Sequence, residues 1–138
     1  MPEPDRTSYK LNLLNRLVLL SKILYYSKNI EKNGMGWIFR REHNKNCGDR
    51  LRSRDEEYLI REELSRVSIV FLMNIFKADC LTYSYTLKKM LNARHVDARL
   101  IIGVRTQPFY SHSWVEVDGK IVNDDPFLRD KLSVIAEI

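Results

Sequence analysis

The fold is decided by the stretch Ser113-Trp-Val-Glu-Val-Asp-Gly-Lys-Ile-Val-Asn123, in which two runs of β-forming residues flank Asp118-Gly119. Asp-Gly between such runs is a strong signal for a tight hairpin, because both residues tolerate a positive φ. We therefore expect antiparallel strands at Ser113–Val117 and Lys120–Asn123. The run Arg99-Leu-Ile-Ile-Gly-Val104 upstream predicts a third strand. The C-terminal part of the chain is thus expected to form an antiparallel sheet.

Helices are expected before this sheet. From Tyr9 to about Tyr26, leucines recur at the helical spacing of three and four residues. A second helix is expected from Asp55 to about residue 76, with one break, because acidic side chains suit the positive end of the helix dipole. A third helix is expected from Cys80 to Asn92, with Asp79 as its N-cap.

The segment 29–50 is expected to be irregular, because three glycines interrupt any long element. The arginine-rich part at 40–54 is most simply a solvated face, and an acidic peptide or partner protein is the alternative. His43, Cys47 and, further along, His95 have no neighbours that point to chemistry. We therefore give these three residues no functional role.

Length and composition indicate a single compact soluble domain, with 138 residues, 44% hydrophobic and 30% charged. Expected helices followed by an expected antiparallel sheet indicate the α+β class. The net charge is +5, from 23 basic and 18 acidic side chains, which favours acidic partners but is too small to indicate nucleic acid. No run has the length of a membrane span. The start of the chain lacks a signal-peptide pattern, so we expect a cytoplasmic protein with free thiols. The scattered histidines predict neither a metal site nor a cofactor.

Three residues have the types of a cysteine-nucleophile triad: Cys80, His112 and Asp124. A thiolate needs an imidazole to take its proton, and the imidazole needs a carboxylate to fix its tautomer. Cys80 opens a predicted helix, where free amides favour a thiolate and offer an oxyanion site. Each residue taken alone has a plainer interpretation, as a small packed cysteine or a partly exposed histidine. Together they predict hydrolysis or acyl transfer at an amide bond.

The third member of the triad stays open on pattern alone. A two-residue turn at Asp118-Gly119 pairs His112 with Asp125, whereas a glycine bulge puts Asp124 on the face of His112. Asn123 is a further candidate, since amides orient histidine in some cysteine proteases. Glu116 shares the face of His112 but lies about 6.6 Å along the strand, so it is less apt.

From Cys80 onward the chain resembles the C-terminal protease domain of the lasso-peptide leader peptidases. The resemblance rests on Cys80-Leu opening a helix, on two runs before the histidine, and on two runs from it. These are Asp97-Ala-Arg-Leu-Ile-Ile-Gly-Val104, Pro108-Phe, His112-Ser-Trp-Val-Glu-Val-Asp-Gly119 and Val122-Asn-Asp-Asp-Pro126. Many members have alanine where this chain has Ser113.

The resemblance implies a transglutaminase-like, papain-like cysteine protease core at 77–138, preceded by a helical region at 1–76. It assigns the catalytic roles to Cys80, His112 and Asp124, and so favours the bulged hairpin. It also implies removal of the leader from a ribosomally made precursor before an ATP-dependent cyclase closes the macrolactam. Phe109, Tyr110 and Trp114 are candidates for the wall of a substrate channel, with packing as the alternative.

The N-terminal region lacks the strands that a winged-helix leader-recognition module would need. The resemblance is therefore to the stand-alone protease, which implies a separate leader-recognition protein as partner.

Two other functions remain open. A transglutaminase-like acyl transferase would use the same triad with an amine acceptor, and a peptide-binding assembly subunit would use none of it.

Overall fold

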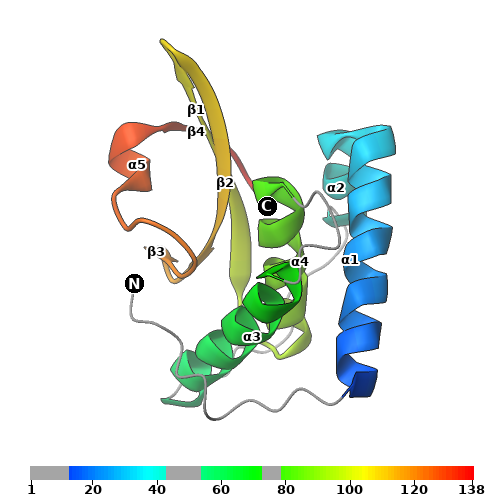
Figure 1. Ribbon diagram of the computed structural model, residues 1–138. Coiled ribbons are helices and arrows are strands. Elements are labelled where there is room, and N and C mark those ends of the chain that lie inside the picture. Colours follow the sequence, from blue (N-terminus) through cyan, green and yellow to red (C-terminus); the bar gives the residue numbers. More distant parts are fainter. Residues whose placement is uncertain (1–12, 43–53, 73–78) are drawn as a thin grey trace.

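The computed structural model describes residues 13–42, 54–72 and 79–138, which form helices packed on a four-stranded antiparallel sheet (Figure 1). The sheet has the order β3-β2-β1-β4. In chain order the elements are α1 (Leu13–Asn33), α2 (Met35–Glu42), α3 (Arg54–Leu72), α4 (Cys80–Ala93), β1 (Ala98–Thr106), β2 (Phe109–Val117), β3 (Lys120–Ile121), α5 (Leu128–Lys131) and β4 (Ser133–Glu137). The α+β class is confirmed. The division between residues 76 and 77 lies outside the described residues and stays a prediction.

The hairpin between β2 and β3 is the plain two-residue form. Asp118 and Gly119 have φ of 54° and 73°, and Val117 pairs directly with Lys120. Two successive positive φ values define the turn whose twist suits a hairpin. The plain turn, which the pattern left open, is therefore the one formed, and the glycine bulge that the resemblance favoured is wrong. The ladder is also shorter than expected, because β3 ends at Ile121.

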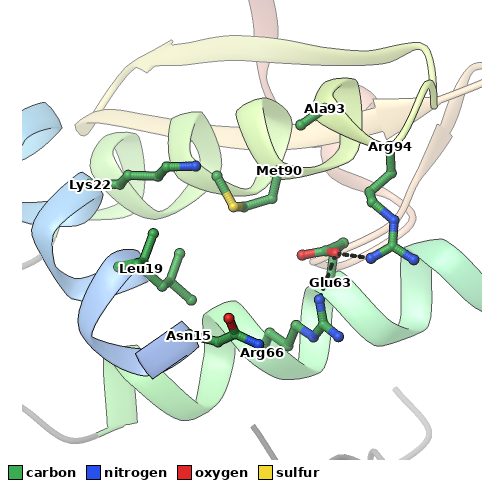
Figure 2. A pocket seen from close by; sticks show the side chains of 9 residues that line it. Asn15, Leu19, Lys22, Glu63, Arg66, Met90, Ala93 and Arg94 are labelled. Atoms are coloured by element: carbon green, nitrogen blue, oxygen red, sulfur yellow. Dashed lines mark hydrogen bonds and ion pairs between the residues drawn. The ribbon is translucent and has the colours of Figure 1, made fainter. Parts of the chain in front are cut away.

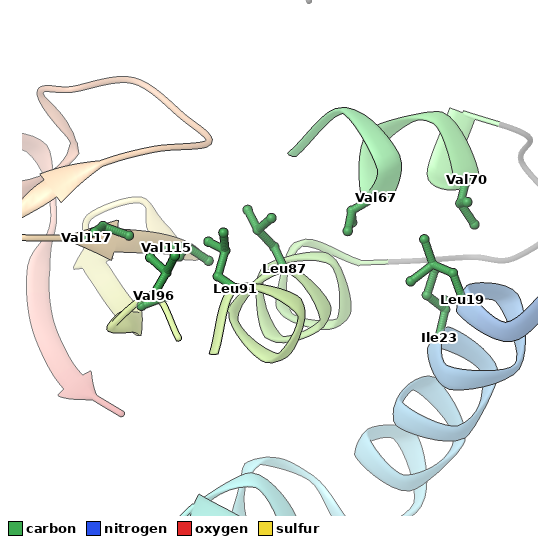
Figure 3. Close-up of a cluster of buried hydrophobic side chains, with 10 residues drawn as sticks. Leu19, Ile23, Val67, Val70, Leu87, Leu91, Val96, Val115 and Val117 are labelled. Atoms are coloured by element: carbon green, nitrogen blue, oxygen red, sulfur yellow. The ribbon is translucent and has the colours of Figure 1, made fainter. Parts of the chain in front are cut away.

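One face of the sheet packs against α4, which is itself covered by α1 and α3 (Figure 3). From α4, Leu87 and Leu91 meet Val115 and Val117 of β2. On the other side of α4 lie residues of α1 and α3, namely Leu19, Ile23, Val67 and Val70. Fully burying an aliphatic side chain contributes about 1.5–3 kcal/mol. A core shared by five elements therefore fixes α4 firmly on β1 and β2.

The other face of the sheet is also covered, by α5 and the segment that leads into β4 (Figure 1). Trp114 of β2 is fully buried there with Leu128 and Leu132. Its indole Nε1 donates to Glu116, which also accepts two hydrogen bonds from Arg129. Strand β2 is thus buried on both faces in its second half.

The segment expected to be irregular is helical as far as it is described. Gly34, at φ 64°, ends α1 and lets α2 follow at once. At the end of α2, Glu42 accepts hydrogen bonds from Tyr85, Lys88 and Lys89 of α4. Burial raises the pKa of Glu42, but the hydrogen bonds from these three residues outweigh it and hold the pKa at about 2.

Candidate active site

Cys80 is the first residue of α4, and its thiol is free and exposed. Asp79 caps the helix as expected, with its carboxylate accepting from the amide of Thr82 at 2.8 Å. The negative charge of Asp79 is therefore engaged by the backbone. The amides of Cys80 and Leu81 have no acceptor within the helix, as at every helix start. This end of α4 thus favours negative charge at the sulfur and beside it.

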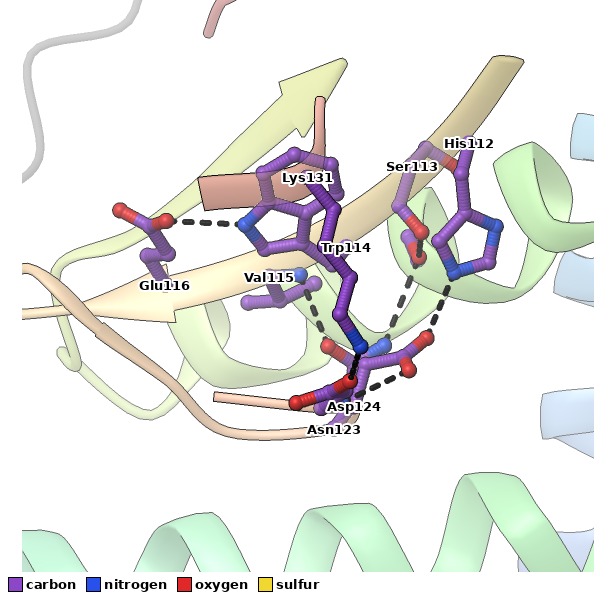
Figure 4. Close-up of polar contacts among 10 residues, drawn as sticks. His112, Ser113, Trp114, Val115, Glu116, Asn123, Asp124 and Lys131 are labelled. Atoms are coloured by element: carbon purple, nitrogen blue, oxygen red, sulfur yellow. Dashed lines mark hydrogen bonds and ion pairs between the residues drawn. The ribbon is translucent and has the colours of Figure 1, made fainter. Parts of the chain in front are cut away.

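His112 and Asp124 are brought together directly (Figure 4). Nε2 of His112 lies 2.6 Å from Oδ2 of Asp124, and the other oxygen of Asp124 accepts from the amide of Asp125. In the neutral imidazole, a carboxylate acceptor at Nε2 favours the tautomer with the proton on Nε2 and the free lone pair on Nδ1. The imidazole is therefore held in the tautomer that a base toward a thiol needs.

The other candidates for the third member are engaged elsewhere. Asp125 accepts from Nζ of Lys131 at 2.6 Å and from the amide of Phe127. These contacts, led by that from Lys131, lower the pKa of Asp125. Glu116 belongs to the Trp114 and Arg129 cluster described above. Asn123 bonds the backbone of Val115, so Asp124 is the residue that meets His112.

Cys80 is tied to this pair through its helix. Ser84 lies four residues on, one helical turn or about 6 Å along the axis on the same face. Its hydroxyl donates to the carbonyl oxygen of Ser113 at 3.1 Å, directly beside His112 in β2. No hydrogen bond joins the Cys80 thiol to His112 in the described part of the chain. His112 and Asp124 are therefore joined by a direct hydrogen bond. The Cys80 thiol is positioned relative to them only through the packing of α4 on β2.

Aromatic rings flank His112 along β2. Tyr110 stacks on the imidazole at 5.9 Å between ring centroids, and Trp114 lies at 6.4 Å on the other side. Phe109 is 75% exposed and Tyr110 is 45% exposed, so their substrate role stays a prediction. Trp114 is fully buried between the sheet and α5, which favours the alternative role in packing, and its place in a substrate wall stays a prediction.

Tyr83 is a neighbour of the site that sequence reasoning missed. It stands three residues after Cys80 on α4, and its hydroxyl hydrogen-bonds Ser68 of α3 at 2.8 Å. Burial raises the pKa of Tyr83, the bond to Ser68 opposes this, and the charge of Asp124 adds to the rise. The i, i+3 spacing from Cys80 was the available signal. Tyr83 links α3 to the carboxylate side of the site.

A separate cavity of about 200 Å³ lies between α1, α3 and α4 (Figure 2). The ion-paired Glu63, Arg66 and Arg94 line it, and burial raises the pKa of Glu63. The cavity touches none of the three triad residues. Over residues 13–42, 54–72 and 79–138, no group of three potential ligands is arranged for a metal. No helix in those ranges is long and apolar enough to cross a bilayer.

Similar known proteins identify the family of this chain. Over all 138 residues the chain is 63% identical to the microcin J25-processing protein McjB of Escherichia coli, and it spans 65% of the length of that protein. No solved structure matches the chain significantly. The family model described as the transglutaminase-like superfamily matches residues 23–137, from within α1 to the end of β4. The chain therefore belongs to the transglutaminase-like superfamily.

Proposed function

We propose that this chain is a cysteine peptidase that removes the leader from a ribosomally made lasso-peptide precursor before macrolactam closure. The observation that carries the proposal is the bonded pair of His112 and Asp124 beside the helix that Cys80 opens. The superfamily is consistent with this chemistry. The similarity to a protein named for processing microcin J25 supports a precursor peptide as substrate.

In the proposed mechanism, Nδ1 of His112 accepts the proton of the Cys80 thiol, because Nε2 is already bonded to Asp124. The thiolate attacks the carbonyl carbon at the junction of leader and core. In this proposal the free amides of the first turn of α4 donate to the developing oxyanion. The imidazolium then donates its proton to the leaving amine of the core peptide. Water, deprotonated by His112, hydrolyses the leader thioester and restores the thiol.

The substrate is expected to approach along the exposed start of β2. Phe109 and Tyr110 present their rings to solvent there, and Tyr110 stacks directly on His112. Aromatic rings supply large apolar contact areas for peptide side chains. Both residues are therefore proposed to contact the precursor.

Three partners follow from the proposed role. They are the precursor peptide, a separate leader-recognition protein that presents the leader, and the ATP-dependent cyclase that takes the freed core. A ribosomally made precursor is available in the cytoplasm, so the reaction is expected there. The proposal includes no cofactor and no nucleic acid.

The test is mass spectrometry of a precursor peptide incubated with this protein and the leader-recognition protein. Wild type should give one defined cut, and Cys80→Ala should give none, whereas Cys47→Ala should cut normally. Asp124→Asn should slow cleavage by at least about 10²-fold, because it loses the acceptor that holds His112. Asp125→Asn is the matched control, since this carboxylate bonds Lys131 and not His112.

Two results would overturn the proposal. Equal rates for Asp124→Asn and Asp125→Asn would remove the pair from the chemistry. Transfer of the leader acyl group to an added primary amine, in preference to water, would make the protein an acyl transferase that uses the same thiol.

A further inference from the structure

The position of Asp124 depends on where the chain leaves the sheet. In a plain two-residue hairpin the antiparallel register would continue to pair His112 with Asp125. Instead the backbone ladder stops after one further hydrogen bond, which the amide of Val122 donates to the carbonyl oxygen of Val115 at 3.0 Å. The amide of Val115, however, donates to Oδ1 of Asn123 at 2.8 Å. A side chain has taken the place of a strand carbonyl, and the chain is released from strand alternation at this residue.

The other end of the same side chain reaches α4. Nδ2 of Asn123 donates a hydrogen bond to Oγ of Ser84 at 3.4 Å, and the hydroxyl of Ser84 donates one to the carbonyl oxygen of Ser113 at 3.1 Å. A hydroxyl has one proton and two lone pairs, so both bonds are compatible. Ser84 is only 1% exposed, so neither contact competes with bulk water. Helix α4, strand β2 and the segment after β3 therefore meet at the hydroxyl of Ser84.

Each member of this chain of hydrogen bonds stands beside one residue of the candidate site. Asn123 precedes Asp124, Ser113 follows His112, and Ser84 is one turn from Cys80 on the same face of α4. A shift of any one of the three segments relative to the others would change the geometry of thiol, imidazole and carboxylate. Displacements of about 1 Å at a reacting site cost about 10²-fold in rate.

We propose that Ser84 and Asn123 are positioning residues for Cys80, His112 and Asp124. Asn123 sets where Asp124 leaves the edge of β2, and Ser84 fixes the first turns of α4 against that point. Neither residue touches the reacting atoms, so both act through the three residues that they hold. The catalytic part of this assignment rests on the proposed peptidase function, whereas the geometric part does not.

The variants Ser84→Ala and Asn123→Ala test the assignment, with Thr86→Val as matched control. Thr86 is buried in the same helix, and its hydroxyl donates to the carbonyl of Thr82 within that helix. Its loss therefore leaves the contacts between α4, β2 and Asn123 intact. Circular dichroism and thermal melting first establish which variants are folded. Ser84→Ala removes a single oxygen atom, so it carries the test alone where Asn123→Ala does not fold.

Two readouts separate positioning from general stability. For leader cleavage, we expect kcat to fall by about 10-fold or more while KM stays within about 2-fold, because substrate contacts are unchanged. Without any substrate, the nuclear magnetic resonance signal of the His112 Nε2 proton should be sharp in wild type and Thr86→Val. It should be lost to exchange in Ser84→Ala. The loss of rate in the double variant should be smaller than the product of the two single losses, because both substitutions remove the bond between Ser84 and Asn123.

Values of kcat for folded Ser84→Ala and Asn123→Ala that match Thr86→Val would overturn the assignment. A sharp signal of the His112 Nε2 proton in both Ser84→Ala and Asn123→Ala would overturn it as well. A wild-type protein that cuts no precursor would refute the proposed function instead. The proton signal would then still decide whether Ser84 and Asn123 hold the pair of His112 and Asp124.

Discussion

Replacing Gly103 with alanine tests how tightly Trp114 and Leu132 pack against β1 beside His112. Gly103 pairs directly with His112 across β1 and β2. A Cβ at this position would lie 2.8 Å from the Trp114 ring and 2.9 Å from Cβ of Leu132. Carbon atoms in contact normally stay about 3.5–4.0 Å apart. The Trp114 ring is fully buried and hydrogen-bonded to Glu116, so it has no free space into which to move.

The expected cost follows from these contacts. Overpacking of a core costs about 1–3 kcal/mol, whereas replacing glycine by alanine without strain gains about 0.4–1 kcal/mol through the unfolded chain. Taking the middle of each range, the net destabilisation of Gly103→Ala is about 1.3 kcal/mol. For a domain of this length, that lowers Tm by about 3–8 °C. Because Trp114 packs beside His112, cleavage activity should fall as well.

Gly36→Ala is the matched control. Gly36 lies in α2, and its added Cβ would have its nearest contact at 3.5 Å, with Nη1 of Arg40. Alanine is favoured over glycine in helices by about 1 kcal/mol, so this variant should be more stable than wild type. Urea unfolding followed by circular dichroism compares the two variants directly. A Gly103→Ala protein as stable as wild type, or stabilised like Gly36→Ala, would refute the account of the packing behind His112.

Four further changes test other parts of the structure. The pKa of Glu42 is about 2 in the folded protein against 4.5 for the free group, so its ionised carboxylate adds about 3 kcal/mol to the free energy of unfolding above pH 4.5. This stabilisation is lost as the pH falls toward 2, so the urea midpoint of wild type should fall over this range and that of Glu42→Gln should not. The same pH dependence of the urea midpoint in both proteins would contradict this prediction. Ser113→Ala should raise the free energy of unfolding by about 1 kcal/mol, because its buried hydroxyl has no partner in the described structure; a lower urea midpoint would disagree. Phe109→Ala should leave Tm unchanged but raise the KM for leader cleavage, since the ring is exposed. Trp114→Phe should do the opposite, lowering Tm through the lost bond to Glu116 while KM stays constant; reversed results for these two would show that the roles are exchanged.

Local signals predicted much of the architecture. The cap at Asp79, the helix that Cys80 opens and the Asp118-Gly119 turn depend on neighbours in sequence, and the structure has all three. The strands β1 and β2 were found but are longer than predicted. Short elements were missed: α5 and β4 have few residues each, and their burial arises from contacts with Trp114 and β1 rather than from their own pattern.

The site shows a similar division. Residue types and order were enough to select Cys80 and His112 as candidates, but pattern alone left Asp124 and Asp125 undecided. The resemblance favoured Asp124 through a bulged turn, whereas the structure brings Asp124 to His112 through a plain turn and an interrupted ladder. That interruption depends on the side chain of Asn123 bonding Val115. The alternation of side chains along a strand does not predict that a side-chain oxygen will replace a backbone carbonyl as acceptor.

The most direct test of the central claim is to trap the covalent intermediate on Cys80. The protein is mixed with precursor peptide and the leader-recognition protein, quenched in acid, and weighed intact before proteolytic mapping. We expect an adduct with the mass of the leader acyl group, located on the peptide that contains Cys80. We also expect that Cys80→Ala shows neither adduct nor cleavage. Cleavage by Cys80→Ala at the wild-type rate would contradict the account.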